Sequence, residues 1–254
     1  MQWLAAVEAI VHDAGRVVMA VYEGDFEVRG KSDASPVTAA DERAEALIVP
    51  ALQALAPGVP VVAEEAVAAG RVPVVGDRFW LVDPLDGTRE FVNRNGEFTV
   101  NVALIENGAP VLGVVLAPAV GRLFAGVVGQ GAWAVDRAVG GQRRPIQCRQ
   151  VPDEGLTVVA SRSHGDAAAL DAFLVGRRVA RLAQAGSSLK LCLLAAGEAD
   201  LYPRFGRTME WDIAAGHAVL AAAGGAVTDL AGAPLRYGKP GFENPHFVAR
   251  GLGD

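Results

Sequence analysis

The hexapeptide Asp83-Pro84-Leu85-Asp86-Gly87-Thr88 places two carboxylates three residues apart, directly after the apolar run 79–82. That run predicts a strand, and a strand that ends in acidic residues presents their side chains at the edge of a sheet. Carboxylate oxygens are the ligands that Mg²⁺ prefers. The hexapeptide therefore predicts a divalent-cation site, although, taken alone, the simpler interpretation is a turn in which Asp83 and Asp86 only cap a helix.

The end of the hexapeptide also suits a phosphate group. If a helix begins after Asp86, the backbone N–H groups of Gly87 and Thr88 face a bound anion. Glycine has no side chain, so a phosphate can approach the backbone closely at that point. A metal ion and a phosphate would then meet in one place.

Other acidic residues occur in matching contexts. Glu64-Glu65 follows the apolar run 61–63, and Asp212 introduces the small-residue segment 213–218. Asp212 alone could be an N-cap. Thr38 and Asp41 fit a capping box, so capping is the preferred interpretation of Asp41 alone. Capping and catalysis are compatible, and the repeated contexts weaken the interpretation of the hexapeptide as a simple turn.

Apolar spacing predicts the elements of the N-terminal part. Helices are expected over residues 4–22 and 38–55, with Pro50 marking a kink or break in the second. Residues 98–106 and 111–117, on either side of Asn107-Gly108, predict a β-hairpin. The Gly-, Ser- and Asp-rich segment 30–36 between the two helices is a candidate lid.

The pattern changes near residues 143–153, where apolar patterning lapses. Beyond this point strands alternate with helices, which is typical of an α/β arrangement. We therefore predict an α+β half over residues 1–150, with most of the metal ligands, and an α/β half over 151–254 that completes the metal site and the substrate pocket. The later strands are expected at 156–160 and 179–182, and the helices at 167–175 and 188–196.

Composition favours a globular protein that acts on a small ligand. The chain has 254 residues, is 51% hydrophobic and has a net charge of -6, and no basic run suggests a nucleic-acid polymer as partner. Cys148 and Cys192 lack the spacing of a zinc site or a disulfide framework. The first residues lack the features of a secretory signal, and the apolar run 109–120 is too short to span a bilayer. We expect a cytoplasmic protein without a transmembrane helix.

Together these motifs resemble the inositol monophosphatase-like, lithium-sensitive phosphatase superfamily. Its patterns D-P-[IL]-D-G-T, E-E, W-D-x-A-A-G and T-x-x-D are present at residues 83–88, 64–65, 211–216 and 38–41. Within the superfamily, residues 89–101 and the segments 31–38, 186–190 and 201–206 look like the bacterial 3'(2'),5'-bisphosphate nucleotidases, the CysQ type.

The resemblance implies an α+β fold, the layered α-β-α-β-α sugar-phosphatase fold, with the site between the two halves. It also implies two or three Mg²⁺ ions. One would be held by Glu64, Asp83 and the Leu85 carbonyl, and a second by Asp83, Asp86 and Asp212; a third, looser ion would lie near Glu64. The implied catalytic residues are Asp41, Thr88 and Glu64; the Thr88 hydroxyl and Asp41 would hold the attacking water and help to deprotonate it.

The substrate implied by the resemblance is adenosine 3',5'-bisphosphate, with 3'-phosphoadenylyl sulfate as a second candidate, which would place the protein in sulfur metabolism. The implied substrate-binding residues are Glu64, Leu85, Asp86, Gly87, Thr88, Ser187, Lys190 and Asp212. A lysine on a predicted helix is more often solvated, and contact between Lys190 and the retained phosphate is the alternative. The charged segment 206–210, which includes Glu210, differs from the more neutral stretch expected in relatives.

Two rival functions stay open from the sequence. One is an inositol-1-phosphate or sugar-bisphosphate phosphatase of the same superfamily, and the other is a non-catalytic protein that keeps the carboxylates for regulation or structure. The resemblance also makes lithium inhibition an expectation and permits peripheral association with the cytoplasmic face of the inner membrane. The oligomeric state is open between monomer and homodimer.

Overall fold

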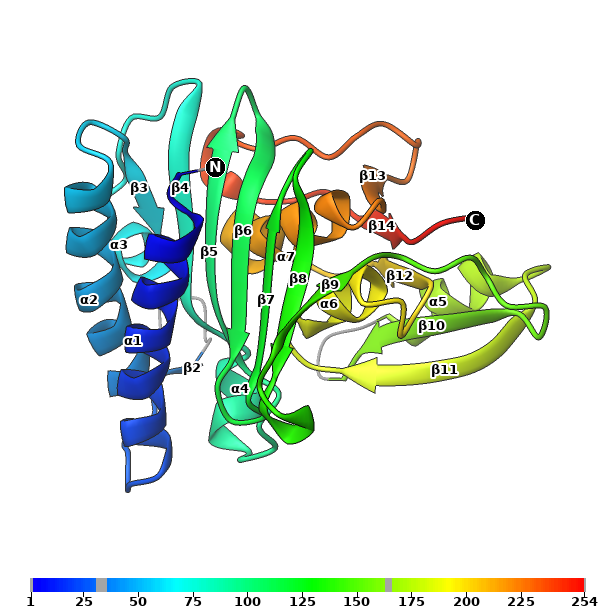
Figure 1. Ribbon diagram of the computed structural model, residues 1–254, viewed down its shortest axis with the longest axis horizontal. Coiled ribbons are helices and arrows are strands. Elements are labelled where there is room, and N and C mark those ends of the chain that lie inside the picture. The colour runs from blue at the N-terminus through cyan, green and yellow to red at the C-terminus, as the bar shows by residue number, and fades with distance from the viewer. Residues whose placement is uncertain (1, 31–35, 163–165, 254) are drawn as a thin grey trace.

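The computed structural model of the protein describes residues 2–30, 36–162 and 166–253. Its main elements form five layers (Figure 1): helices α1 and α2, a seven-stranded sheet, helices α6 and α7, a five-stranded sheet, and helix α5. This arrangement confirms the predicted layered α-β-α-β-α fold. The helix bounds are α1 Leu4–Tyr22, α2 Ala39–Leu55, α3 Glu64–Ala68, α4 Thr88–Val92, α5 Ala167–Leu174, α6 Leu189–Ala195 and α7 Glu210–Ala222.

The seven-stranded sheet has its strands in chain order, from β3 to β9. β3 is parallel to β4, and each later pair is antiparallel. Asn107 and Gly108 both have positive φ, 52° and 72°, as a tight hairpin turn requires, so the predicted hairpin is confirmed as β5 and β6. The strands are β3 Val61–Ala63, β4 Arg78–Asp86, β5 Thr99–Glu106, β6 Ala109–Ala117, β7 Arg122–Val127, β8 Gly131–Asp136 and β9 Arg143–Ile146.

The five-stranded sheet has the order β11-β10-β12-β14-β13. β10 pairs in parallel with both β11 and β12, whereas β14 is antiparallel to its two neighbours. The elements predicted beyond residue 152 are confirmed, although β11 is longer than expected. The strands are β10 Leu156–Ser161, β11 Val179–Ala185, β12 Leu201–Arg204, β13 Ala226–Asp229 and β14 Phe247–Arg250.

The remaining elements are short. β1 Arg29–Gly30 pairs with β2 Pro36–Val37, and 3₁₀ turns occur at Arg137–Val139 and Pro240–Phe242. Residues 31–35, the centre of the candidate lid, lie outside the described part of the chain. No helix within the described residues is long and apolar enough to cross a membrane.

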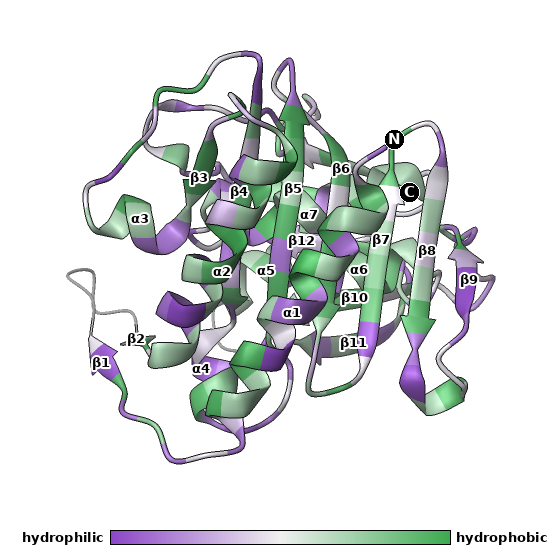
Figure 2. Ribbon diagram, turned by 60° about the vertical axis from the view of Figure 1, so that its left-hand side comes forward, coloured by the Kyte–Doolittle hydropathy of each residue, from purple (hydrophilic) through white to green (hydrophobic). Residues whose placement is uncertain are grey.

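Helices α1 and α2 cover one face of the seven-stranded sheet. Val7, Val11 and Val18 of α1 are fully buried, at the helical spacing that puts them on one side. Helix α2 continues through Pro50 to Leu55, so the predicted break does not occur; its buried side chains pack on the sheet on both sides of the proline, and packing outweighs the lost backbone hydrogen bond. Figure 2 shows hydrophobic residues along β5, inside this sheet, and hydrophilic residues on β9 at its edge.

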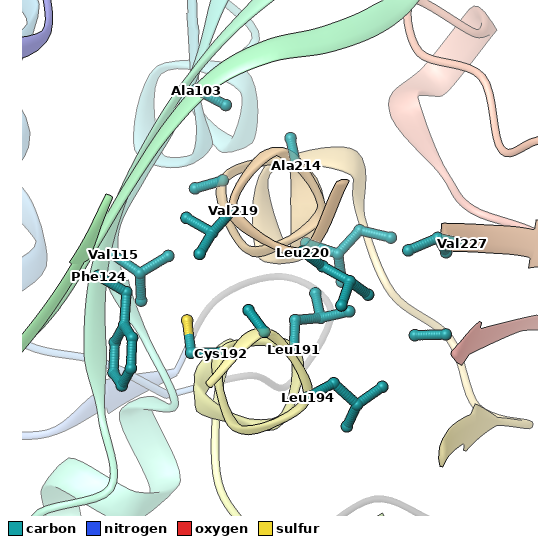
Figure 3. Close-up of a cluster of buried hydrophobic side chains, with 14 of the residues drawn as sticks. Ala103, Val115, Phe124, Leu191, Cys192, Leu194, Ala214, Val219, Leu220 and Val227 are labelled. Atoms are coloured by element: carbon teal, nitrogen blue, oxygen red, sulfur yellow. The ribbon is translucent and has the colours of Figure 1, made fainter. Parts of the chain in front are cut away.

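A second core lies between the two sheets. Figure 3 shows Val115 and Phe124 of the first sheet facing Cys192 of α6 and Val219 of α7, so Cys192 is a core residue, as expected. The backbone of α7 comes so close to the sheet that a Cβ added at Gly113 would lie 2.2 Å from the Ala215 carbonyl oxygen. Helix α7, which begins at the candidate site, is therefore held between both sheets.

The first sheet is built from residues 61–146 and the second from 156–250. Both sheets contribute to one hydrophobic cluster around α6 and α7. Packing thus joins the two parts closely, and the division into residues 1–150 and 151–254 stays a prediction.

Candidate active site

A β-bulge in strand β4 brings Asp83 and Asp86 to the same face. Asp83 pairs with Asn101 of β5 and Asp86 pairs with Thr99, with an irregular register between them. Residues three apart in a regular strand face opposite sides, but here three steps on β4 match two steps on β5. The strand thus continues through Asp86 and does not end before Asp83 as the sequence suggested, because the bulge absorbs Pro84 and Leu85 within the ladder.

The two carboxylates of the bulge have different surroundings. Asp83 is 2% exposed, and its Oδ1 accepts a hydrogen bond from the Leu85 N–H at 3.0 Å. Asp86 is half-buried and lines a cavity, and Asn101 Nδ2 donates to its Oδ2 at 3.3 Å. The bulge therefore presents one deeply buried and one accessible carboxylate to the same space.

Two further carboxylates come from other elements. β3 is parallel to β4, and Ala63 lies opposite Val82. Glu64 and Asp83, the next residues along the two strands, are therefore neighbours. Asp212 is the third residue of α7, and its Oδ2 accepts from the Met209 N–H at 2.8 Å. Asp212 thus does cap the start of α7, from inside its first turn.

Three of these carboxylates have raised pKa values. Burial, the charges of Glu64, Asp86 and Asp212, and a hydrogen bond with Glu64 raise the pKa of Asp83 well above its usual value. The pKa of Asp212 is raised in the same direction by burial, Asp86 and Glu64. Burial also raises the pKa of Asp86, to about 6, against the opposing effect of the Lys190 charge. A bound cation would relieve this repulsion.

The chemistry of the donor set fits Mg²⁺. All four side chains offer hard oxygen ligands, as Mg²⁺ requires, and no softer ligand takes part. Over residues 2–30, 36–162 and 166–253, no three His, Cys, Asp or Glu side chains are arranged so that they could hold a metal ion as they stand. The assignment of individual ligands stays a prediction.

Asp41 and Thr88 meet beside the carboxylate cluster. Asp41 is 1% exposed, and its Oδ2 accepts from the Thr38 N–H and hydroxyl, both at 2.8 Å; the predicted capping box is confirmed. Its other oxygen, Oδ1, lies 3.4 Å from Thr88 Oγ1, which is also 3.4 Å from the Leu85 carbonyl oxygen. Burial raises the pKa of Asp41 to about 7. Asp41 therefore both caps α2 and faces the hydroxyl of Thr88.

The predicted helix after Asp86 is confirmed as α4, whose cap residue is Gly87. Gly87 has a φ of 87°, and a Cβ there would lie 3.3 Å from both the Glu97 carbonyl oxygen and Glu90 Oε2. Glycine is thus required here by backbone conformation and by space. Gly87 and Thr88 both line the cavity next to the carboxylates.

The carboxylate cluster, Gly87 and Thr88 line one cavity of about 550 Å³, whereas Asp41 lies behind Thr88 and is not part of the lining. Its lining joins the cluster of Glu64, Asp83, Asp86 and Asp212 to cationic side chains from the C-terminal part. The sequence-predicted residues that line it are Glu64, Asp83, Leu85, Asp86, Gly87, Thr88, Ser187, Lys190 and Asp212, and the lining cations include Arg89, Arg204 and Arg207.

Lys190 is buried, so the expectation of a solvated side chain is wrong. It is 5% exposed, and Nζ donates to the carbonyls of Ser187 at 2.5 Å and Ala185 at 3.3 Å. Nζ also lies 5.3 Å from the centre of the Tyr202 ring, and burial lowers the pKa of Lys190 to about 8. The helical pattern could not reveal this, because the face of α6 that bears Lys190 is turned inward between the two sheets.

A polar contact beside the cavity was not singled out from the sequence. The Arg162 guanidinium donates to both carboxylate oxygens of Glu97, at 2.9 and 3.0 Å. Glu97 Oε2 also accepts from the Gly186 N–H at 2.9 Å. These bonds join the segment after α4 to the one before Ser187, which has a φ of 47°. The resemblance includes Glu97 and Gly186, but their pairing is a tertiary contact that spacing does not reveal.

The fold and the carboxylate-lined cavity define a protein of the inositol monophosphatase family, and the chain belongs to this family, whose pattern it matches over residues 2–250. The expected likeness to the bacterial nucleotidases is also confirmed. The 3'(2'),5'-bisphosphate nucleotidases CysQ of Shigella flexneri and Escherichia coli K12 are each 48% identical over 94% of this chain and 95% of theirs.

Solved structures agree with this placement. CysQ from Bacteroides thetaiotaomicron, a bacterial member of the inositol monophosphatase family, has a TM-score of 0.82 and 36% identity, over 99% of this chain and 97% of its own. An inositol monophosphatase from Anabaena has a TM-score of 0.77 and 25% identity, over 98% and 90%.

Proposed function

We propose that the protein is a Mg²⁺-dependent 3'(2'),5'-bisphosphate nucleotidase that hydrolyses adenosine 3',5'-bisphosphate to AMP and phosphate. The observation that supports this most is the joining, in one cavity, of a buried carboxylate cluster and the buried cation Lys190. A substrate with two phosphates could place one of them at the metal ions that the cluster would hold and the other at Lys190. The identity of 48% to CysQ nucleotidases supports the same substrate, and 3'-phosphoadenylyl sulfate is the second candidate.

Two or three Mg²⁺ ions would be held by Glu64, Asp83, the Leu85 carbonyl, Asp86 and Asp212. When bound, they would neutralise the charge of the phosphate and lower the pKa of a water molecule. The raised pKa values of Asp83, Asp86 and Asp212 support this role, because burial and neighbouring negative charges disfavour ionised carboxylates until a cation is bound.

Asp41 and Thr88 would take the proton from the attacking water. The Thr88 hydroxyl donates to Asp41 Oδ1, so its oxygen is left with lone pairs that can accept a hydrogen bond from water. A carboxylate with a pKa of about 7 accepts a proton effectively near neutral pH. Glu64, which lines the same cavity, completes the proposed catalytic set.

The substrate would be oriented by both parts of the chain. Gly87 and Thr88 would face the phosphate that is removed, and Ser187 and Lys190 would contact the phosphate that remains. Tyr202 and Trp211 add ring surface to the cavity, which suits a nucleoside. We further propose that the enzyme is cytoplasmic. Cell fractionation tests whether it is attached to the inner membrane, and light scattering distinguishes a monomer from a homodimer.

The test is phosphate release from adenosine 3',5'-bisphosphate, inositol 1-phosphate and fructose 1,6-bisphosphate, each with Mg²⁺ and with a chelator. We expect preference for the nucleotide and loss of activity on chelation. Preference for inositol 1-phosphate or the sugar bisphosphate would keep the chemistry and overturn the substrate. No release from any of the three would overturn the proposal.

A further inference from the structure

An ion pair between the fully buried Glu210 and the half-buried Lys239 anchors the first residue of helix α7. Glu210 is 0% exposed, and its carboxylate accepts from the N–H groups of Gly238 at 2.8 Å and Lys239 at 3.0 Å. Lys239 Nζ donates to the same carboxylate at 2.6 Å. A buried charge persists only with such partners. The unusual charge before Trp211 in the sequence is thus matched by a lysine 29 residues away.

Lys239 has three N–H donors, and each has an acceptor. Besides Glu210, they reach the Arg236 carbonyl at 2.6 Å and Asn244 Oδ1 at 3.2 Å. Asn244 Nδ2 in turn donates to the Met209 carbonyl at 2.8 Å. The side chains of Lys239 and Asn244 therefore fix the residues that immediately precede α7.

These bonds end at the carboxylate cluster. Met209, held through its carbonyl by Asn244, donates its own N–H to Asp212 Oδ2 at 2.8 Å. A hydrogen-bonded path thus runs from Lys239 through Asn244 and Met209 to Asp212. Hydrogen bonds in the outer shell of a metal site orient its ligands and tune the affinity for the ion.

We propose that Lys239, Glu210 and Asn244 are positioning residues that set the orientation of Asp212 toward a divalent cation, an inference that rests on the proposed function. The body of α7 does not depend on them, because Ala214, Ala215 and Val219 pack it between the sheets. The three residues act on the first turn, where Asp212 lies. Their loss should change metal binding more than it changes the fold.

The test measures binding of Mn²⁺ to the substrate-free protein, by electron paramagnetic resonance of the free ion, beside thermal unfolding. Lys239→Met and Asn244→Ala are expected to weaken Mn²⁺ affinity roughly 10- to 100-fold, the usual cost of losing an outer-shell partner. In assays of phosphate release, a high concentration of Mg²⁺ should restore the rates of the Lys239→Met and Asn244→Ala variants. Asn244→Ala leaves no buried charge unpaired, so it stays informative where Lys239→Met fails to fold.

Arg149→Met is the matched control. Arg149 makes two hydrogen bonds with the buried Asp200, at 2.8 and 2.9 Å, and Asp200 also accepts from the Thr157 N–H in the second sheet. This variant should lower the melting temperature and leave Mn²⁺ affinity unchanged. If the wild type binds Mn²⁺ and both Lys239→Met and Asn244→Ala bind it equally well, this inference is overturned and the proposed function stands. A wild type that binds no Mn²⁺ would overturn the proposed function with it.

Discussion

Thr88 Oγ1 lies 3.4 Å from Asp41 Oδ1, although the two residues are 47 positions apart in the sequence. Asp41 is held in place by the capping box at the start of α2, and Thr88 is the first residue of α4. The start of one helix therefore presents a buried carboxylate to the start of another. The residue that caps α2 is thus also a candidate proton acceptor beside the carboxylate cluster.

Removing the proton acceptor should lower kcat. Asp41→Asn is expected to reduce it by roughly 10²- to 10⁴-fold, the usual contribution of general base catalysis. The amide still accepts from Thr38, so the cap and the fold should survive. Steady-state kinetics with thermal unfolding test this. Thr88→Val should be impaired and Thr88→Ser active; equal activity of the two Thr88 variants would contradict a role for the hydroxyl.

Asp83→Asn should separate activity from stability. The change replaces a carboxyl group whose ionisation is disfavoured by burial and by the charges of Glu64, Asp86 and Asp212, so the metal-free protein should not unfold at a lower temperature. Activity should fall by roughly 100-fold or more, since direct ligands matter at least as much as their outer-shell partners. Asp171→Asn, on the exposed side of α5, is the control. Retained activity in Asp83→Asn would refute its assignment.

Metal removal should make stability depend on pH. Because the folded pKa values of Asp83, Asp86 and Asp212 are raised above the usual 3.8, the folded protein binds protons that the unfolded chain has released. Stability is thus lost as pH rises from about 4 through 6 and beyond. We expect Mg²⁺ to raise the melting temperature more at about pH 8 than at about pH 5. An equal rise at both pH values would argue against a carboxylate site.

His217 should give the opposite pH dependence. It is buried, Nδ1 lies 2.8 Å from the Tyr237 hydroxyl oxygen, and burial lowers its pKa from 6.5 to about 4. Below pH 6.5 the unfolded chain takes up a proton that the folded protein does not, so stability is lost as pH falls toward 4. In urea unfolding, the free energy of unfolding of the wild type should fall by about 2 kcal/mol relative to that of His217→Gln between about pH 7.5 and about pH 5. If the free energy of unfolding depended on pH equally in the wild type and in His217→Gln, His217 would be excluded as the source of the effect.

Lys190→Met tests the recognition of a second phosphate. Losing a charged hydrogen bond of about 1.5–3 kcal/mol should raise KM for adenosine 3',5'-bisphosphate roughly 10- to 100-fold. A substrate with a single phosphate, such as inositol 1-phosphate, should be affected much less. A similar loss on both substrates would mean that Lys190 acts through its neighbour Asp86 instead.

Most of the fold could be predicted because it depends on local patterns. The spacing of Val7, Val11 and Val18 gave α1, and Asn107-Gly108 gave the hairpin of β5 and β6. The course of α2 through Pro50 was not predictable, because packing against the sheet decides it. The bulge that unites Asp83 with Asp86 depends on the register with β5 and is equally invisible in the sequence.

The candidate site could be predicted where motifs supply its residues, and not where tertiary pairing does. Glu64, Asp83, Asp86 and Asp212 were found from sequence contexts, and the structure brings them together. The burial of Lys190 and its pairing with backbone carbonyls were missed. Lysine is rare in this chain, and both described lysines, Lys190 and Lys239, make specific polar contacts close to the site.

The most direct test of the metal-centred account is a crystal structure grown with Mn²⁺ and phosphate, with the ions located by anomalous scattering. We predict two or three Mn²⁺ peaks between Glu64, Asp83, Asp86 and Asp212, with the phosphate beside Gly87 and Thr88. Mn²⁺ bound elsewhere, or no peak at these four carboxylates, would contradict the account.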